Sequence, residues 1–364
     1  MMPATPIPVS ILTGFLGSGK TTLLNRLLKD PALRDTAVII NEFGDVGIDH
    51  LLVEQSSDGV IELSDGCLCC TVRGELVDTL ADLVERLQTG SIGALARVVV
   101  ETTGLADPAP VLHAIMGHPV LVRHFRLDGV VVAVDAVNGD STLDHHEEAI
   151  KQVAVADRIV LTKTDLVAPA SSRLAALTER LRRINPGAPQ IRADEDAALV
   201  GGLFECGLYD PETKSADVAR WLRDEAYGQR HDHHHDVNRH DARIRAFTLT
   251  EDRPVDPAAL EMFVDLLRSS QAEHLLRMKG IVCLSDDPDR PVVVHGVQSI
   301  FHPPARLDAW PGTDRRSRLV VITRDLEEDF VRRLFRAFTD RPQVDMPDRQ
   351  ALANNPLAIP GFKP

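Results

Sequence analysis

The stretch Gly14-Phe-Leu-Gly-Ser-Gly-Lys20-Thr21-Thr22 decides the fold of this chain. It matches the phosphate-binding pattern of glycine, four residues, glycine, lysine, then serine or threonine. An apolar, β-branched run at residues 7–12 precedes it and predicts a buried strand, and residues 23–28 follow with apolar side chains at helical spacing. A strand, a glycine-rich loop and a helix form the context that this pattern requires, and the alternative is a glycine-rich turn that binds no nucleotide.

The residue types in this loop suit a nucleotide phosphate. Glycines let backbone N–H groups turn inward onto phosphate oxygens, and the N-terminus of the following helix adds a partial positive charge. We expect Lys20 to reach the β- and γ-phosphates and the Thr21 hydroxyl to hold Mg²⁺. The predicted nucleotide contacts come from the whole loop: Gly14, Gly17, Ser18, Gly19, Lys20, Thr21 and Thr22.

Length and composition indicate an ordinary globular protein of two or three domains. The chain has 364 residues, of which 44% are hydrophobic and 26% charged. The formal net charge of −14 argues against binding to nucleic acid or to an anionic membrane surface, because both need a basic face. The sequence has neither an 18-residue apolar run nor a signal-peptide pattern, so we expect no membrane contact and a cytoplasmic location.

The first 200 residues predict a doubly wound α/β fold with a mostly parallel sheet. Near-continuous Val, Ile and Leu runs are typical of parallel strands that helices cover on both faces. Helical segments such as 74–87 and 171–184 alternate with these runs. The predicted strands are residues 7–12, 37–41, 97–101, 129–134, 158–161 and 190–192.

A change in composition predicts a second domain. Residues 228–241 are rich in His and Asp and lack apolar periodicity, so they predict an exposed linker between a P-loop domain, 1–227, and a smaller α+β domain, 242–340. The tail, 341–364, has a composition typical of disorder. In the second domain we expect strands at 243–250, 280–284, 291–301 and 317–323 and helices at 256–268 and 326–338.

A nucleotide site also needs a carboxylate near the Mg²⁺ ion. Glu101 ends an apolar run and can hold Mg²⁺ through water, and the N–H of Gly104 can meet the γ-phosphate and register its loss. We therefore predict catalytic roles for Lys20 and Glu101. Asp135 ends another apolar run and is the alternative carboxylate.

The run Thr162-Lys163-Thr164-Asp165 predicts the choice of base. The Asp165 carboxylate can accept hydrogen bonds from N1–H and the 2-amino group of guanine, which adenine does not offer, and the Lys163 stem would lie along the base. The usual GTPase motif has asparagine where this chain has Thr162. The alternative is an ordinary polar loop.

The run Asn41-Glu42-Phe-Gly-Asp45 follows the second predicted strand, where a switch loop normally lies. Glu42 would orient the attacking water, and Asp45 would contact Mg²⁺ or a second metal. The alternative is a solvated turn.

Three of the five cysteines crowd into Cys67-Leu68-Cys69-Cys70. Thiolates suit Zn²⁺ and Cu⁺, and a three-sulfur site that is open on one side suits a metal that must leave again. The alternatives are a structural zinc site and a redox pair. Cys206 and Cys283 have apolar neighbours and are expected in the core.

Histidines provide a second, weaker candidate metal site. The linker carries His231, His233, His234 and His235, which can bind Zn²⁺, Co²⁺ or Ni²⁺ loosely; the alternative is a solvated segment without a metal role. The pair His145-His146 is expected at the surface.

Taken together, these motifs resemble the CobW-type metallochaperone GTPases, P-loop proteins related to the nickel chaperones HypB and UreG. Some members of that family also have threonine at the position of Thr162. His118 matches a histidine that binds extra metal in a relative, whereas Ile40 stands where some relatives have a metal-binding carboxylate. The resemblance is carried by residues 14–22, 41–44, 66–70, 101–104, 162–165, 277–280 and 295–298.

The resemblance implies slow GTP hydrolysis coupled to metal binding at Cys67, Cys69 and Cys70, and delivery of the metal to a client protein. Zinc is the commonest implied cargo, cobalt for cobalamin synthesis is a known branch, and a homodimer is one arrangement left open. The other functions left open are a GTPase that activates a metalloenzyme, a metal storage or buffering protein, and a P-loop kinase of small molecules.

Overall fold

The structure is a computed structural model that describes residues 6–40, 60–63, 72–168, 171–194, 203–204, 243–302 and 304–339. The linker at 228–241, the tail at 341–364 and the predicted domain boundary at 227 lie outside the described residues. Within the described ranges, no helix is long and apolar enough to cross a membrane.

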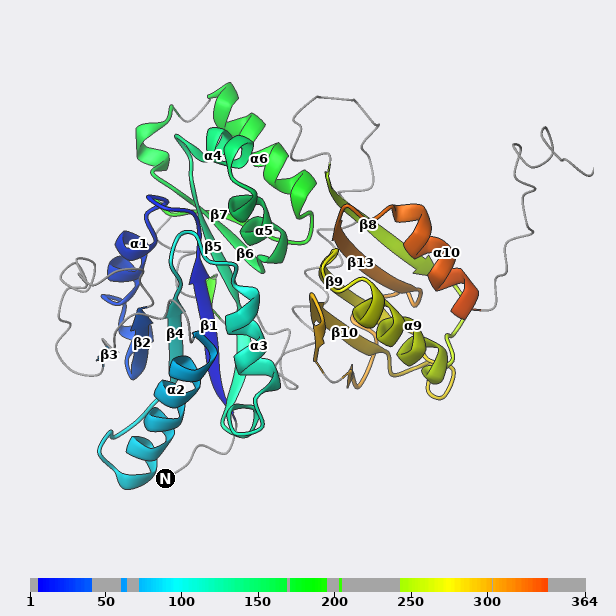
Figure 1. Ribbon diagram of the computed structural model, residues 1–364, viewed down its shortest axis with the longest axis horizontal. Helices are drawn as coiled ribbons and strands as arrows, with labels where there is room; N and C mark the ends of the chain where they lie inside the picture. Colours follow the sequence, from blue (N-terminus) through cyan, green and yellow to red (C-terminus); the bar gives the residue numbers. More distant parts are fainter. Residues whose placement is uncertain are drawn as a thin grey trace, which may run out of the picture.

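A seven-stranded parallel sheet occupies the first half of the chain (Figure 1). Its order is β3-β2-β4-β1-β5-β6-β7, so β1 lies between β4 and β5. A parallel sheet opens a ligand crevice at the carboxyl ends of its strands, at the point where the strand order reverses. The strands are β1 (Ile7–Thr13), β2 (Thr36–Ile40), β3 (Val60–Leu63), β4 (Arg97–Glu101), β5 (Phe125–Asp135), β6 (Arg158–Thr162) and β7 (Gln190–Arg192).

Helices cover both faces of this sheet, because the strands are apolar on both faces. On one face Leu24 and Leu27 of α1 pack with Val99 of β4. On the other, Leu112 and Val153 lie in a core with the opposite side chains of the same strands. The helices are α1 (Lys20–Leu27), α2 (Val72–Thr89), α3 (Ala109–Gly117), α4 (Gly139–His145), α5 (Glu147–Val155) and α6 (Ser172–Ile184), with short 3₁₀ turns at Pro31–Leu33, Leu121–Arg123 and Thr164–Leu166.

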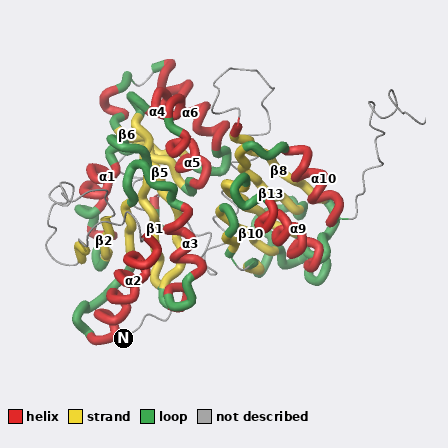
Figure 2. Tube along the Cα trace, viewed as in Figure 1, coloured by secondary structure: helices red, strands yellow, loops and turns green. Residues whose placement is uncertain are grey.

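An antiparallel sheet forms the second half, with helices α9 and α10 packed on one face (Figure 2). Asp256 caps α9 by accepting hydrogen bonds from the N–H groups of Ala258 and Ala259 at 2.8 and 3.2 Å, as its place before Pro257 predicts. The predicted α/β plus α+β architecture is confirmed. The elements are β8 (Ile244–Glu251), α9 (Pro257–Ser270), β9 (Leu275–Val282), β10 (Val292–Val297), β11 (Ile300–Phe301), β12 (Ala305–Arg306), β13 (Ser317–Arg324) and α10 (Glu328–Phe338).

Two strands begin earlier than their apolar runs predict, because each carries charged residues that are buried. The strand predicted from residue 280 begins at Leu275 and includes Arg277 and Lys279. The strand predicted from residue 129 begins at Phe125, and it includes Asp128, which accepts a hydrogen bond from the Ser10 hydroxyl at 2.7 Å. Each charge has a partner across the fold, and this pairing makes its burial tolerable.

The strand predicted at 291–301 is instead two strands, β10 and β11. Gln298 lies between them with a φ of 51°, which a continuous strand does not allow. The chain turns there, and β11 folds back on β10.

The two halves meet at a buried charge cluster around Asp157, between α5 and β6. The Asp157 carboxylate is fully buried and accepts hydrogen bonds from Arg277 and Lys279 of β9 and from the N–H of Val130. Burial alone would raise the pKa of Asp157, but Arg277, Lys279 and His295 hold it far below its usual range. Burial and the nearby Arg277 lower the pKa of Lys279 to about 8 despite the attraction of Asp157.

We expect Asp157→Asn to lower the free energy of unfolding by about 3–5 kcal/mol at pH 7, because it leaves buried cations without their counter-ion. Urea unfolding followed by circular dichroism measures this loss. The unfolded carboxyl titrates near pH 4, so the stabilisation by Asp157 is present above that pH and is lost as the pH falls towards its depressed folded pKa. The gap between wild type and variant should therefore narrow below about pH 4.

The depressed pKa of Lys279 changes stability with pH in the same direction as that of Asp157, but in a higher pH window. Between about pH 8 and the higher pKa of an unfolded lysine, the unfolded chain binds more protons, so this group makes stability rise with pH there.

Asp308→Asn is the matched control for Asp157→Asn. Asp308 pairs with Arg290 while fully exposed, so its substitution should leave the unfolding midpoint unchanged. An equal effect of the two substitutions would contradict the cluster's role.

Candidate functional site

The phosphate loop connects β1 to α1 at the reversal point of the sheet, and three of its glycines have positive φ. Gly14, Gly17 and Gly19 have φ values of 142°, 71° and 85°, which L side chains rarely adopt. At Gly14 a Cβ would also lie 2.3 Å from the carbonyl oxygen of Ala133. The loop therefore presses against the end of β5, and only glycine permits that approach.

The predicted Mg²⁺ residues lie together beside this loop. The Thr21 hydroxyl donates to Oε1 of Glu101 at 2.9 Å, and Glu101 is buried. Parallel pairing of β1 with β4, in which Leu12 lies opposite Glu101, places the carboxylate there. A hydroxyl and a carboxylate oxygen are hard ligands of the kind Mg²⁺ prefers, so these residues fit the ion.

Lys20 is the first residue of α1 and is almost fully buried. Its Nζ donates to the carbonyl oxygen of Gly14 at 2.9 Å and lies 3.5 Å from that of Phe15. The amine is therefore held at the loop itself, where a phosphate-binding lysine is required.

The segment after β4 packs directly against the phosphate loop. A Cβ on Gly104 would lie 2.5 Å from the backbone nitrogen of Leu16, so any other residue would push the two backbones apart. Thr102 strengthens the junction, since its hydroxyl donates to that of Thr13 at 2.7 Å. The predicted sensor glycine thus lies at the loop that would hold the phosphates.

Thr162, at the position of the usual asparagine, supports the loop through its hydroxyl. Its Oγ1 donates to the carbonyl oxygen of Ser18 at 2.6 Å and lies 3.2 Å from that of Val134. Lys163 Nζ donates to the carbonyl oxygen of Gly17 at 2.7 Å. The end of β6 is therefore fastened to the phosphate loop at two successive residues.

Asp135, the alternative Mg²⁺ carboxylate, has a different set of partners. Lys163 Nζ lies 2.8 Å from Oδ2, and the N–H groups of Val137 and Asn138 donate to Oδ1 at 2.7 and 3.1 Å. Burial raises its pKa, but these donors outweigh burial and leave the pKa below its usual value. Its contacts bind Asp135 to Lys163 and to its own turn, whereas Glu101 contacts Thr21.

Asp165 lies in the exposed turn that follows β6, next to Leu166, whose relative exposure is 69%. The loop after β7 closes on this turn, since Thr164 hydrogen-bonds to Asp194. Arg192 and that bond hold the pKa of Asp194 below its usual range. Asp194 is not among the residues predicted from the sequence, although it follows a predicted strand whose carboxyl end lies at the same edge of the sheet as the phosphate loop.

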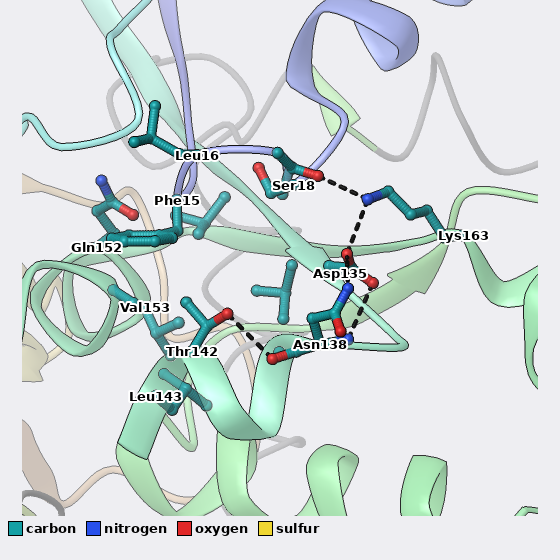
Figure 3. A pocket seen from close by; sticks show the side chains of 16 residues that line it. Phe15, Leu16, Ser18, Asp135, Asn138, Thr142, Leu143, Gln152, Val153 and Lys163 are labelled. Atoms are coloured by element: carbon teal, nitrogen blue, oxygen red, sulfur yellow. Dashed lines mark hydrogen bonds and ion pairs between the residues drawn. The ribbon is translucent and has the colours of Figure 1, made fainter. Parts of the chain in front are cut away.

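A pocket of about 180 Å³ lies behind the phosphate loop, between the loop and helices α4 and α5 (Figure 3). Phe15, Asn138, Thr142 and Gln152 are among its lining residues, and Figure 3 shows Lys163 joined to the loop and to Asp135 at one side. The pocket shares the loop with the phosphate site but lies on the sheet face opposite α1.

Other predicted residues have mixed outcomes. Exposed His146 stacks on the ring of Phe15, with ring centroids 4.2 Å apart, so this surface histidine also touches the phosphate loop. Cys283 is buried, as expected. Within the described residues, no three His, Cys, Asp or Glu side chains form a group that could hold a metal, and His118 is therefore not part of such a group. Outside the described residues lie Asn41, Glu42, Asp45, Cys67, Cys69, Cys70, Cys206, His231, His233, His234 and His235.

The fold and this site define a P-loop nucleotide-binding protein with an appended antiparallel-sheet domain. Residues 8–192 match the family model described as the CobW/HypB/UreG nucleotide-binding domain, and residues 244–339 match that of the cobalamin synthesis protein CobW C-terminal domain. The chain belongs to the CobW family, as its motifs predict.

Two named relatives match along most of their length. The zinc chaperone YjiA of Escherichia coli is 35% identical over 332 residues, covering 91% of this chain and 98% of the relative. The zinc-regulated GTPase metalloprotein activator 1 of Saccharomyces cerevisiae is 27% identical, and the match covers 91% of this chain and 83% of the relative. A crystal structure of Zn(II)-bound YjiA superposes with a TM-score of 0.68 at 29% identity, covering 92% of this chain and 99% of that one.

We expect Thr162→Val to weaken nucleotide binding about tenfold, because it leaves the buried carbonyl of Ser18 without its donor and loosens the loop. Titration with a fluorescent GDP analogue measures the dissociation constant. Thr162→Ser retains the hydroxyl and should stay close to wild type. Wild-type affinity in the valine variant would show that the loop does not depend on this bond.

Proposed function

We propose that this chain is a GTP-hydrolysing zinc metallochaperone, which binds zinc at Cys67, Cys69 and Cys70 and passes it to a client protein according to its nucleotide state. One observation carries the nucleotide half: the contact of Thr21 with Glu101 beside a phosphate loop on which Gly104 packs. The metal half is supported by similarity to a named zinc chaperone, which is 35% identical to this chain and matches over 98% of its own length.

In this proposal the phosphate loop, Lys20 and Thr22 hold the phosphates of GTP, and Thr21 and Glu101 hold Mg²⁺. The ion supplies charge neutralisation at the phosphates and a fixed orientation for them. Buried Lys20 keeps its ammonium beside the loop, where a positive charge stabilises the negative charge that builds up during phosphoryl transfer. Glu42 is proposed to orient the attacking water.

The base site is proposed at the turn that follows β6. Asp165 is exposed there and can accept both guanine donors, and Lys163 already spans from the turn to the phosphate loop. Its stem would thus lie along one face of the base.

The metal half of the proposal depends on chain connectivity. The segment that carries Cys67, Cys69 and Cys70 leaves the sheet after Leu63 at the end of β3 and rejoins the described chain at Val72, the start of α2. Because β3 is parallel to β2, the segment leaves at the same edge of the sheet as the phosphate loop. A reducing compartment such as the cytoplasm would keep the thiols free for zinc.

The yeast relative, named a metalloprotein activator, favours delivery to a client over storage. Cobalt remains an alternative cargo, since thiolates accept several divalent ions. In a storage protein, the histidines at 231–235 would bind many equivalents of metal without regard to nucleotide.

The proposal predicts that zinc affinity differs between the GDP-bound and GTP-analogue-bound forms, by the same factor by which zinc changes the nucleotide affinity. Competition with a chromophoric chelator measures the tight site in each form. The double variant Cys69→Ala, Cys70→Ala should lose that tight site, whereas replacing His233, His234 and His235 with alanine should leave the nucleotide dependence intact.

Competition is the necessary measurement, because a Zn(II)-bound structure of YjiA also exists for a variant in which a glutamate and two cysteines are replaced by alanine. Zinc occupancy alone therefore does not identify the cysteines. Equal zinc affinities in the apo, GDP and GTP-analogue forms would remove the coupling, and an unchanged metal capacity after Lys20→Ala would favour storage.

The two candidate carboxylates are separated by kinetics. Glu101→Gln removes the charge next to Thr21, and we expect it to lower the kcat of Mg²⁺-dependent GTP hydrolysis about 100-fold. Asp135→Asn removes the partner of Lys163, so it should mainly weaken nucleotide binding. Phosphate release at saturating GTP, measured over a range of Mg²⁺ concentrations, distinguishes them, and the reverse pattern would assign the ion to Asp135.

A further inference from the structure

Gln152, in the middle of α5, holds the segment that contains Gly104. Its Nε2 donates to the carbonyl oxygens of Gly104 at 3.2 Å and of Ala106 at 3.0 Å, and the side chain is 1% exposed. Only the amide nitrogen has two N–H groups for two carbonyls, so these partners set the orientation of the side chain. No motif or spacing in the sequence marks this residue.

The helix that carries Gln152 is held at both ends by the second domain. Glu147, its first residue, pairs with Arg243 at 2.6 Å and with Arg324 at 3.4 Å. At the other end the carbonyl of Val155 accepts a hydrogen bond from Arg277. Because α5 is fixed at both ends, the carboxamide of Gln152 is presented from a rigid support.

A second side chain contacts the same segment from the second domain. Gln298, in the turn between β10 and β11, donates to Oδ2 of Asp107 at 3.4 Å. The stretch from Gly104 to Asp107 is thus held by α5 and by the second sheet, while Gly104 itself lies against Leu16 of the phosphate loop.

We propose that Gln152 is the positioning residue for the γ-phosphate sensor. Its two hydrogen bonds fix the backbone on the carboxyl side of Gly104, which keeps the Gly104 N–H directed at the position of a third phosphate. The preference of the protein for triphosphate over diphosphate then depends on this carboxamide. The inference rests on the proposed GTPase function, and it concerns a residue outside the predicted nucleotide and metal contacts.

The test compares two variants that each remove one buried carboxamide: that of Gln152 in α5, and that of Asn185, which follows α6 and contacts the end of α5. Gln152→Met retains the length of the side chain and removes both donors to the sensor segment. Asn185→Leu is the matched control: Asn185 is also buried and donates to the carbonyls of Val153 and Ala156 at 2.9 Å each, at the end of the same helix. Dissociation constants for fluorescent GDP and for a non-hydrolysable GTP analogue are measured for each protein, with the thermal midpoint of unfolding.

For Gln152→Met we expect affinity for the GTP analogue to fall about tenfold, the size of one or two lost hydrogen bonds, and affinity for GDP to stay within about twofold. Asn185→Leu should lower the thermal midpoint but keep the wild-type ratio of the two constants. Gln152→Asn, whose shorter side chain cannot reach both carbonyls, should show the same loss of preference and provides the test if the methionine variant does not fold.

An unchanged ratio in both Gln152 variants, or an equal loss of both nucleotides, overturns the positioning role. A wild-type protein that binds the two nucleotides equally also overturns it. A wild type that binds no guanine nucleotide at all overturns the proposed function itself, so the two failures are distinct.

Discussion

The parallel pairing of β1 between β4 and β5 is the constraint on which the rest of the site depends. Leu12 lies opposite Glu101, and Thr13 opposite Val132, so the loops after these strands emerge at one edge of the sheet. A shift of one residue would turn the side chains of a strand to the opposite face and move Glu101 away from Thr21. The site is therefore a product of sheet register.

Close backbone contact is the second recurring feature. Gly14 meets Ala133, and Gly104 meets Leu16, at distances that leave no room for a side chain. Thr162 stands where the usual motif has asparagine, and its hydroxyl supplies a hydrogen-bond donor to the carbonyl of Ser18. The loop is thus supported by packing and by hydrogen bonds to its own backbone.

The domain junction buries charge beside an apolar contact, in which Leu276, Val297 and Ile322 of the second sheet join the core of the first domain. Asp157, just before β6, meets Arg277 and Lys279 of the second sheet, and each buried ion needs its oppositely charged partner to offset the cost of its burial. Such a cluster contributes little net stability, but it is costly to break. It therefore favours one relative placement of the two halves, in which α5 also supports the Gly104 segment.

The amino-acid order by itself determined the phosphate loop, the parallel architecture, the place of the Glu101 carboxylate at a strand end and the family, because these depend on local motif spacing and on continuous apolar runs. It misjudged the starts of β5 and β9, where charges break the apolar run, and it overlooked Gln152 and Asp194. Only the tertiary structure decided those points, since a charge or an amide is buried only when a partner distant in sequence satisfies it. Lys279 has its partner 122 residues away, and Gln152 has one 48 residues away, separations that local patterns do not encode.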